Sequence, residues 1–289
     1  MTSPLSTSAG LPRPKDDELD LFGITHQGRV RTSNQDHFLL CTVHPQVVVR
    51  STSLPDIDHI TLRGERLATI MLVADGVGGS VDGSEASRLA TIAVTEYFAS
   101  AMRCYHTAGS TSEHEFTEAL RNAAIEAHNR VRAQADAQFA GRRMASTLSV
   151  AIVVWPWLYV VQVGDSRCYT YHDGVLQQVT RDQTVAQEMI DRGALSPERA
   201  HNSPLAHVLS SAIGADEALP VISRVDVGKR GTVTLVCSDG LTKHVSDDEI
   251  GAAIGRMTST EQLCQELLDL VLERGGSDNV TIVAGRALP

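Results

Sequence analysis

The pattern of apolar and polar positions divides the chain into blocks with two different periods. Short apolar runs of the kind that form β-strands occur at residues 69–74, 147–154, 158–163, 167–171, 221–227, 232–237 and 280–284. Apolar residues recur at helical spacing over residues 84–102, 113–138, 246–254 and 259–273. Because strand and helix blocks come in groups and do not alternate strictly, the pattern favours packed sheets with helices outside over a doubly wound parallel sheet.

Three segments show neither the strand pattern nor the helical spacing of apolar residues. Residues 44–66 are polar and contain two prolines, which predicts an extended hairpin or loop, and residues 183–215 are expected to form short helices and loops. Residues 1–20 are rich in Ser, Thr and Pro and lack the apolar region of a secretory signal. They are predicted to be a disordered lead-in to one domain over residues 21–289.

Composition and charge exclude several classes of protein. Lys and Arg number 25 against 35 Asp and Glu, a net charge of -10, which argues against nucleic-acid binding and against adhesion to an anionic membrane. The longest apolar stretch, residues 151–163, falls short of the roughly 20 residues that a spanning helix needs. The five cysteines form no C-x-x-C pair, so neither a disulfide framework nor a zinc site is expected, and reduced thiols indicate a cytoplasmic location.

An Asp beside a small residue adjoins a predicted strand or turn at five places. These residues are Asp36, Asp75, Asp165, Asp239 and Asp278. Five carboxylates brought together would repel each other unless a cation neutralised them. No Cys or His accompanies them at ligand spacing, so the ligand set is all oxygen, which indicates Mg²⁺ or Mn²⁺ and argues against zinc or copper. Two such ions a few ångströms apart promote hydrolysis of phosphate esters.

Each of these aspartates, taken alone, also has a structural interpretation. An Asp-Gly after a strand is usually a turn, as Asp173-Gly174 is expected to be. Asp165 could cap a hairpin, and Asp278 with Asn279 could form an Asx-turn. All five aspartates occur together, in order, and each lies in a nearly complete sequence motif. This joint occurrence favours the metal-site interpretation.

The segments that carry these aspartates are R-T-S-N-Q-D (31–36), V-A-D-G-V-G-G (73–79), V-G-D-S-R (163–167), C-S-D-G-L-T (237–242) and S-D-N-V-T (277–281). In this order they resemble the successive motifs of the metal-dependent protein phosphatase 2C family, bacterial type. The resemblance extends from about Gly23 to Ala284. It implies an α+β fold, namely a four-layer α-β-β-α sandwich of two central antiparallel sheets flanked by helices, with a dimetal site at one edge.

The resemblance also implies the ligands of two Mn²⁺ or Mg²⁺ ions. Asp75 would bridge the two ions, and the backbone carbonyl of Gly76 would bind one of them. Asp239 and Asp278 would complete the shell of the second ion, and Asp36 would hold a ligating water or the metal itself.

Three further positions take their roles from the same resemblance. Asp165, together with Asp239, would hold a third and looser ion, and Asn279 would support the ligands from behind. Arg31 would grip the phosphate, because its guanidinium fork matches two phosphoryl oxygens and keeps its charge. Arg31, Asp36 and Asp75 are therefore the expected catalytic residues, although a solvated surface arginine is the alternative for Arg31.

The chain departs from the family pattern at three places that remove no metal ligand. Val77 stands where eukaryotic members have a proposed general acid His, Gln183 stands where a His is usual, and residues 145–147 read Ala-Ser-Thr in place of Gly-Thr-Thr. An apolar residue cannot donate a proton, so another group must protonate the leaving alkoxide. Three histidines near the ligands match no motif position and are interpreted as structural: His26, His37 and His244.

The predicted function is metal-dependent hydrolysis of phosphoserine and phosphothreonine in proteins, without a covalent phosphoenzyme. The expected partners are phosphorylated proteins, among them a Ser/Thr protein kinase and its substrates, and the chain is expected to act as a monomer. Residues 185–220 resemble the family's mobile flap, which often sets substrate choice. The alternatives are a catalytically silent phosphatase-like module that binds a kinase or regulator, and a phosphatase working within a larger signalling chain.

Overall fold

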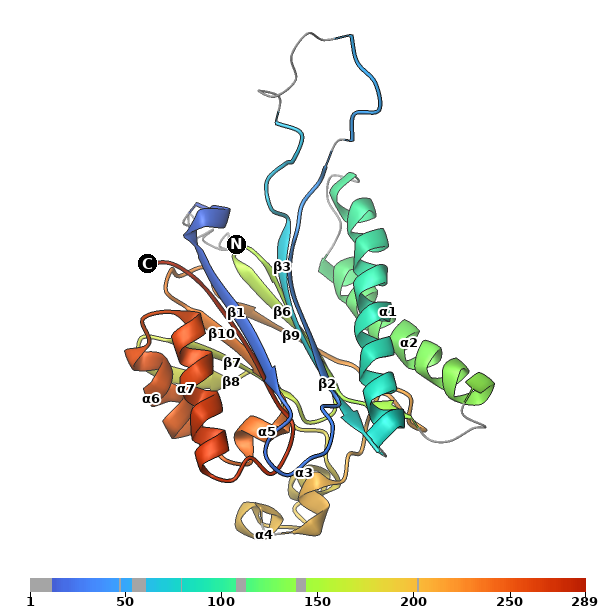
Figure 1. The fold of residues 1–289 in the computed structure, drawn as a ribbon, viewed down its shortest axis with the longest axis vertical. Helices are drawn as coiled ribbons and strands as arrows, with labels where there is room; N and C mark the ends of the chain where they lie inside the picture. Colours follow the sequence, from blue (N-terminus) through green and yellow to red (C-terminus); the bar gives the residue numbers. More distant parts are fainter. Residues whose placement is uncertain are drawn as a thin grey trace, which may run out of the picture.

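The structure is a computed structural model that describes residues 12–46, 48–53, 61–78, 80–107, 113–138, 144–201 and 203–289. Two antiparallel sheets pack face to face, and helices cover the outer face of each (Figure 1). This arrangement confirms the predicted α+β fold with four layers. Among the described helices, none is both long and apolar enough to cross a membrane.

The first sheet has the strand order β1-β11-β10-β7-β8. Its strands are β1 (Leu19–His26), β7 (Arg167–His172), β8 (Val175–Gln178), β10 (Val233–Cys237) and β11 (Val280–Ala287). The helices on its outer side are α6 (Asp247–Arg256) and α7 (Thr260–Glu273), and the short α5 (Asp239–Thr242) directly follows β10 (Figure 1). Tyr169, Leu235 and Ile282 of the sheet pack with Ile250, Leu263 and Leu267 of the helices in one buried cluster.

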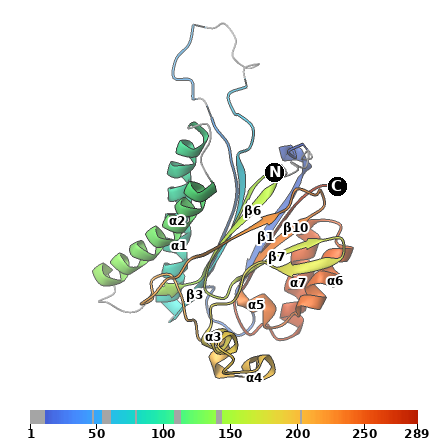
Figure 2. The same ribbon diagram turned by 180° about the vertical axis from the view of Figure 1, so that it is seen from behind.

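The second sheet has the strand order β2-β3-β5-β6-β9. Its strands are β2 (Asp36–Val43), β3 (Ala68–Val77), β5 (Leu148–Val154), β6 (Trp157–Val163) and β9 (Val221–Asp226), and the short β4 (Ala145–Ser146) pairs with the end of β3. The long helices α1 (Ser80–Thr107) and α2 (Glu113–Gln138) lie along its outer face, as both views show (Figures 1 and 2).

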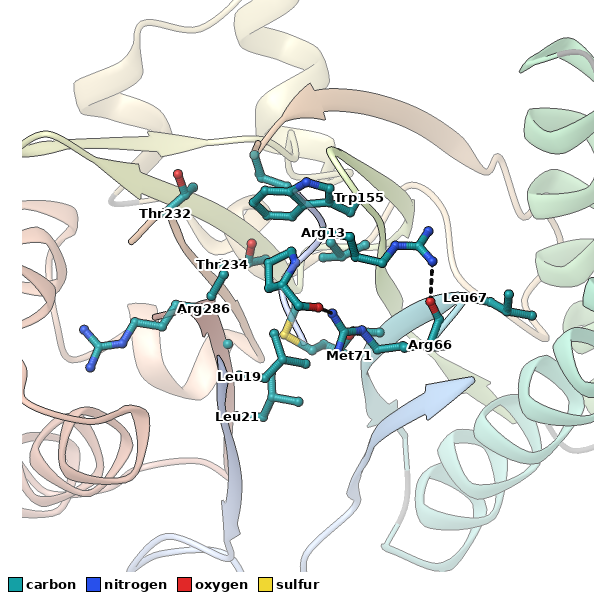
Figure 3. A pocket seen from close by; sticks show the side chains of 16 residues that line it. Arg13, Leu19, Leu21, Arg66, Leu67, Met71, Trp155, Thr232, Thr234 and Arg286 are labelled. Carbon is teal, nitrogen blue, oxygen red and sulfur yellow. Dashed lines mark hydrogen bonds between the residues drawn. The ribbon is translucent and has the colours of Figure 1, made fainter. Parts of the chain in front are cut away.

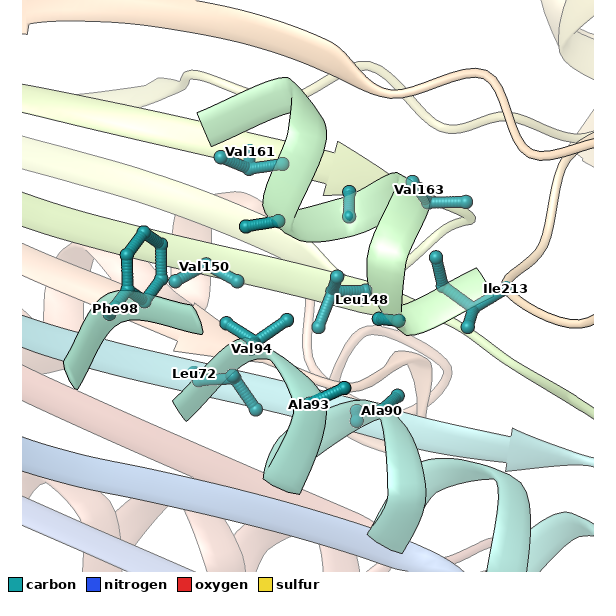
Figure 4. Packing of buried hydrophobic residues seen from close by; sticks show 14 of the residues in the cluster. Leu72, Ala90, Ala93, Val94, Phe98, Leu148, Val150, Val161, Val163 and Ile213 are labelled. Atoms are coloured by element: carbon teal, nitrogen blue, oxygen red, sulfur yellow. The ribbon is translucent and has the colours of Figure 1, made fainter. Parts of the chain in front are cut away.

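The core lies in three layers, and β3 contributes to two of them. Leu72 faces the helices, where it packs with Val94 and Leu148 (Figure 4). Met71 and Val73 face the other sheet and join the cluster between the sheets. Since successive side chains of a strand point to opposite faces, a strand covered on both faces reads as a continuous apolar run. This explains why residues 69–74 lack an alternating pattern.

Two segments extend the layers. The 3-10 helix η1 (Asp16–Glu18) precedes β1, so the predicted domain boundary at residue 21 lies inside β1. Asp20 accepts hydrogen bonds from Thr260 and Arg286, which fixes this strand in the sheet. Within the predicted flap, α3 (Val185–Asp191), α4 (Pro197–His201) and η2 (Pro204–His207) project from one end of the sandwich (Figure 1).

The opposite end of the sandwich, where β3 begins, holds a narrow cavity of about 40 Å³ (Figure 3). Arg13 donates a hydrogen bond to the carbonyl oxygen of Arg66, and Arg66 donates to the carbonyl oxygen of Pro14 and to Asp16. These bonds hold the segment before β1 across the entrance. Arg66 is paired with Asp16 and Arg286 with Asp20, and the cavity lies at the opposite end of β3 from Asp75.

Candidate metal centre

All five predicted aspartates lie at the same end of the sandwich. Asp36 begins β2 and is the register partner of Asp75 near the end of β3. Asp165 lies between β6 and β7, Asp239 begins α5 directly after β10, and Asp278 lies two residues before β11. Because neighbouring strands run antiparallel, the ends of β3, β6 and β10 meet the beginnings of β2, β7 and β11 at one edge.

Asp36 is buried, and only one of its carboxylate oxygens is satisfied. Oδ2 accepts hydrogen bonds from the hydroxyls of Ser238 (2.8 Å) and Thr281 (2.7 Å). Oδ1 is buried and has no hydrogen-bond partner among the described residues. Burial raises the pKa of Asp36 to about 6, since the two hydroxyl donors offset only part of the cost of desolvating the charge.

The backbone of Asp75 is held by Thr147. The amide N–H of Asp75 donates to Thr147 Oγ1 (3.0 Å), and its carbonyl accepts from the amide of Thr147 (2.8 Å). Burial and the repulsion of Asp36 and Asp239 raise the pKa of Asp75 well above its ordinary value. The neighbouring Gly76 lies so close to the start of α1 that a Cβ would overlap the carbonyl of Gly83.

Asp239 and Asp278 share one cation that the sequence analysis missed. Lys243 Nζ lies 2.7 Å from Asp239 Oδ2 and 2.7 Å from Asp278 Oδ2. Burial lowers the pKa of Lys243, but attraction to the two carboxylates outweighs it and leaves the pKa above its ordinary value. The signal in the sequence was the spacing, since a Lys four residues after an Asp faces it across one helical turn.

Arg31 lies at the site, but its guanidinium is hydrogen-bonded to Asp278, another predicted site residue. Nε and Nη2 of Arg31 donate to the two oxygens of Asp278 at 2.7 and 2.8 Å. Burial raises the pKa of Asp278, but hydrogen bonds from Arg31 and Lys243 reverse this and leave the pKa below its ordinary value. The side chain of Arg31 is 52% exposed, so a ligand from solvent can reach it.

Asn279 joins the loops that carry two of the predicted ligands. Its side chain accepts from the amide of Gln35 and donates to the carbonyls of Gln27 and Ser33. One amide side chain therefore ties the loop that precedes Asp36 to the strand that follows Asp278.

Asp165 is buried, and its strand end is tied to the flap by Gln183. Burial and the repulsion of Asp239 and Asp182 raise the pKa of Asp165 to about 7. Gln183 accepts from the amide of Gly164 (2.8 Å) and donates to the carbonyl of Leu219 (2.8 Å). The residue in place of the usual His thus fixes the backbone next to Asp165.

The surroundings of Val77 and of the three nearby histidines are also clear in the structure. Val77 is 39% exposed at the end of β3 and offers no proton. The three nearby histidines each have a partner: His26 Nδ1 accepts from the amide of Gly28, His37 Nδ1 contacts Ser87 Oγ, and His244 Nε2 accepts from the amide of Ser277. These bonds agree with the structural interpretation of the histidines.

The carboxylate oxygens fit a hard divalent cation. Asp36 Oδ1 and Asp239 Oδ1 are the buried side-chain oxygens or nitrogens that lack a hydrogen-bond partner in the described part of the chain. A buried unpartnered carboxylate oxygen is costly, and a cation is its natural partner. No group of three or more Asp, Glu, His or Cys side chains converges at metal-ligand distance among the described residues. Arg31 and Lys243 contact Asp278, and Lys243 also contacts one oxygen of Asp239.

A cleft of about 380 Å³ connects this cluster to the flap. It is lined by Asp165, Asp239 and Lys243, and by residues of α3, α4 and η2. Arg167 in the same cleft is paired with Asp182 through a bidentate contact at 2.7–3.1 Å.

A family model described as Protein phosphatase 2C matches residues 49–275. The chain belongs to the protein phosphatase 2C family. Among curated relatives, the chain is 31% identical over 216 residues to the serine/threonine protein phosphatase PstP of Mycobacterium tuberculosis. That match covers 75% of this chain and 40% of the relative, so the chain spans well under half of its length. The serine/threonine phosphatase stp of Listeria monocytogenes is 29% identical, with 74% and 82% covered.

Solved structures of family members share the architecture. The crystal structure of the Mycobacterium tuberculosis phosphatase PstP/Ppp matches with a TM-score of 0.74 and 26% identity, over 94% of this chain and 99% of that chain. The catalytic domain of PstP in complex with two manganese ions matches with a TM-score of 0.71 and 26% identity over the same shares. The structures therefore agree with the predicted protein phosphatase 2C sandwich.

Proposed function

We propose that this chain is a metal-dependent protein phosphatase that hydrolyses phosphoserine and phosphothreonine. The observation that carries the proposal is the edge of the sandwich where five aspartates gather with two unpartnered buried oxygens, in a member of the protein phosphatase 2C family. Its curated relatives bear the name of serine/threonine phosphatases, which supports the same activity. A catalytically silent module is disfavoured because none of the expected carboxylates has been replaced.

Two Mn²⁺ or Mg²⁺ ions are the proposed cofactors, consistent with the two manganese ions in the PstP complex. Asp75 with the carbonyl of Gly76, and Asp239 with Asp278, would hold them, while Asp36 would bind through its free Oδ1 or through a water. When bound, such ions make hydroxide available near neutral pH and screen phosphoryl charge.

The chain's own residues would orient the substrate. Arg31 would release Asp278 and turn its exposed fork to two phosphoryl oxygens, a geometry that a planar guanidinium matches well. Since Val77 offers no proton, we infer that the leaving alkoxide is protonated from water. The proposed partners are phosphorylated proteins and a Ser/Thr kinase that modifies them, and we propose a monomer that acts in the cytoplasm.

The decisive experiment is hydrolysis of a phosphothreonine peptide with and without metal. We expect phosphate release with Mn²⁺ or Mg²⁺, none after dialysis against EDTA, and recovery when the metal is returned. Asp173→Asn, in an exposed turn away from the site, is the matched control for Asp75→Asn and should keep full activity. Undiminished hydrolysis in excess EDTA, or a metal-loaded protein inert toward phosphopeptides, would overturn the proposal.

A further inference from the structure

Lys243 is placed as a fixed part of the acidic cluster. It follows the one-turn helix α5, and its ammonium spans two elements by contacting Asp239 at 2.7 Å and Asp278 at 2.7 Å. Only 25% of its side chain is exposed. A lysine on a solvated surface seldom holds two carboxylates at this distance, because ordering its long side chain costs entropy.

The two oxygens of Asp239 have different surroundings. Oδ1 is buried without a hydrogen-bond partner, whereas Oδ2 is in contact with the ammonium of Lys243. An ion can therefore bind Asp239 through Oδ1 while Lys243 remains on Oδ2. On its other side Lys243 lines the same cleft as Asp165, and its positive charge acts on Asp165.

We propose that the ammonium of Lys243 holds the Asp239 oxygen that a third metal ion would share with Asp165, so that this site binds two divalent ions beside one built-in cation. The inference rests on the proposed function. A third ion would need Asp239 Oδ2, which Lys243 holds, and it would be repelled by the ammonium. The charges agree with this arrangement, since two divalent ions and one ammonium balance five carboxylates and leave the charge of Arg31 for the phosphate.

The test is the number of Mn²⁺ ions bound, measured by calorimetric titration and by equilibrium dialysis through the millimolar range. The wild-type protein should bind two ions per chain. Lys243→Asn replaces the ammonium by a neutral oxygen donor and should add a third binding event, tighter by about tenfold or more than any third event in wild type. Lys243→Arg keeps the charge and should bind two ions. Lys229→Asn, at an exposed position between β9 and β10, makes the same charge change elsewhere and should also bind two.

Circular dichroism and thermal melts would establish that each variant is folded, and the wild-type count tests the inference even if Lys243→Asn does not fold. Three ions on the wild-type protein, or two on both wild type and folded Lys243→Asn, would overturn the role of Lys243. Neither result would affect the phosphatase proposal. A wild-type protein that binds no Mn²⁺ would instead overturn the proposed function and the inference together.

Discussion

Arg31 and Asp278 form a bidentate ion pair between segments 247 residues apart, with both carboxylate oxygens accepting from one guanidinium fork. The pair joins the loop before β2 to the loop before β11 at the edge where the aspartates gather. Arg31 is the predicted phosphate ligand and Asp278 a predicted metal ligand. A cation on Asp278 would weaken the attraction of its carboxylate for Arg31, so we expect metal binding to promote release of the guanidinium for phosphate.

The first prediction concerns Arg31. Arg31→Ala should lower kcat/KM for a phosphothreonine peptide by roughly ten- to hundredfold, because charge-assisted bidentate contacts contribute about 1.5–3 kcal/mol. Lysine should restore only part of this loss, since it lacks the planar fork. Steady-state kinetics measures the loss, and calorimetry should show Mn²⁺ still binding.

The matched control for Arg31 is Arg29→Ala, an exposed arginine in the same loop. Its kinetics should equal those of the wild type. Equal kinetics for both alanine variants would return Arg31 to the role of a surface residue that only pairs with Asp278.

The second prediction concerns the negative charges of Asp75 and Asp239, two of the proposed metal ligands. Asp75→Asn and Asp239→Asn should each reduce turnover on the order of a hundred- to a thousandfold, the cost of removing one preorganised electrostatic contact. Without metal, Asp75→Asn should be as stable as the wild type or more stable, because the repulsion of Asp75 by Asp36 and Asp239 is relieved. Thermal melts in EDTA beside kinetics at saturating Mn²⁺ test both statements. Near-normal turnover of Asp75→Asn would rule out its role between the ions.

The third prediction is a pH dependence of stability in the metal-free protein. Burial and the repulsion of Asp239 raise the pKa of Asp165 to about 7, whereas in the unfolded chain it titrates near 3.9. Between these values the folded state binds the proton and the unfolded state does not. Stability is therefore lost as the pH rises through this window.

Asp165→Asn removes this titration. Its stability relative to the wild type should increase by roughly 2–3 kcal/mol from pH 5 to pH 8 in EDTA. Urea unfolding at each pH measures the difference, with Asp248→Asn, at an exposed position in the first turn of α6, as the control whose difference should stay constant. A stability difference that does not change with pH for Asp165→Asn would contradict the buried, protonated state.

The fourth prediction concerns the close approach of α5 to β11. A Cβ at Gly240 would overlap the carbonyl oxygen of Asn279. Gly240→Ala should therefore destabilise the fold by about 1–3 kcal/mol and weaken Mn²⁺ binding, since Asp239 and Asp278 would move apart. Gly251→Ala, in α6, would meet Leu176 only at an ordinary contact distance of 3.5 Å. It should be neutral or stabilising, by up to about 1 kcal/mol, because alanine favours a helix over glycine. Denaturant unfolding of both variants measures the contrast.

The sequence by itself determined the fold class and the identity of the acidic residues. The apolar run over residues 147–154 reappears as β5, which begins at Leu148, and the helical pattern over residues 113–138 reappears as α2. These periods follow from local backbone geometry, so they can be read without tertiary information. Likewise, an Asp that adjoins a predicted strand beside a Gly can be recognised in the sequence. The five motifs in order were specific enough to predict the family that the comparisons confirm.

Only the tertiary structure decided how these residues are paired. It brought Arg31 onto Asp278, set Lys243 between Asp239 and Asp278, and left one oxygen each of Asp36 and Asp239 without a partner. It also began β1 at Leu19, because Asp20 is fixed by Thr260 and Arg286 from the far end of the chain. Contacts of this kind depend on which strand ends meet at one edge, and on how much water each carboxylate loses there. Neither quantity is encoded in local spacing, since both arise only when distant segments pack together.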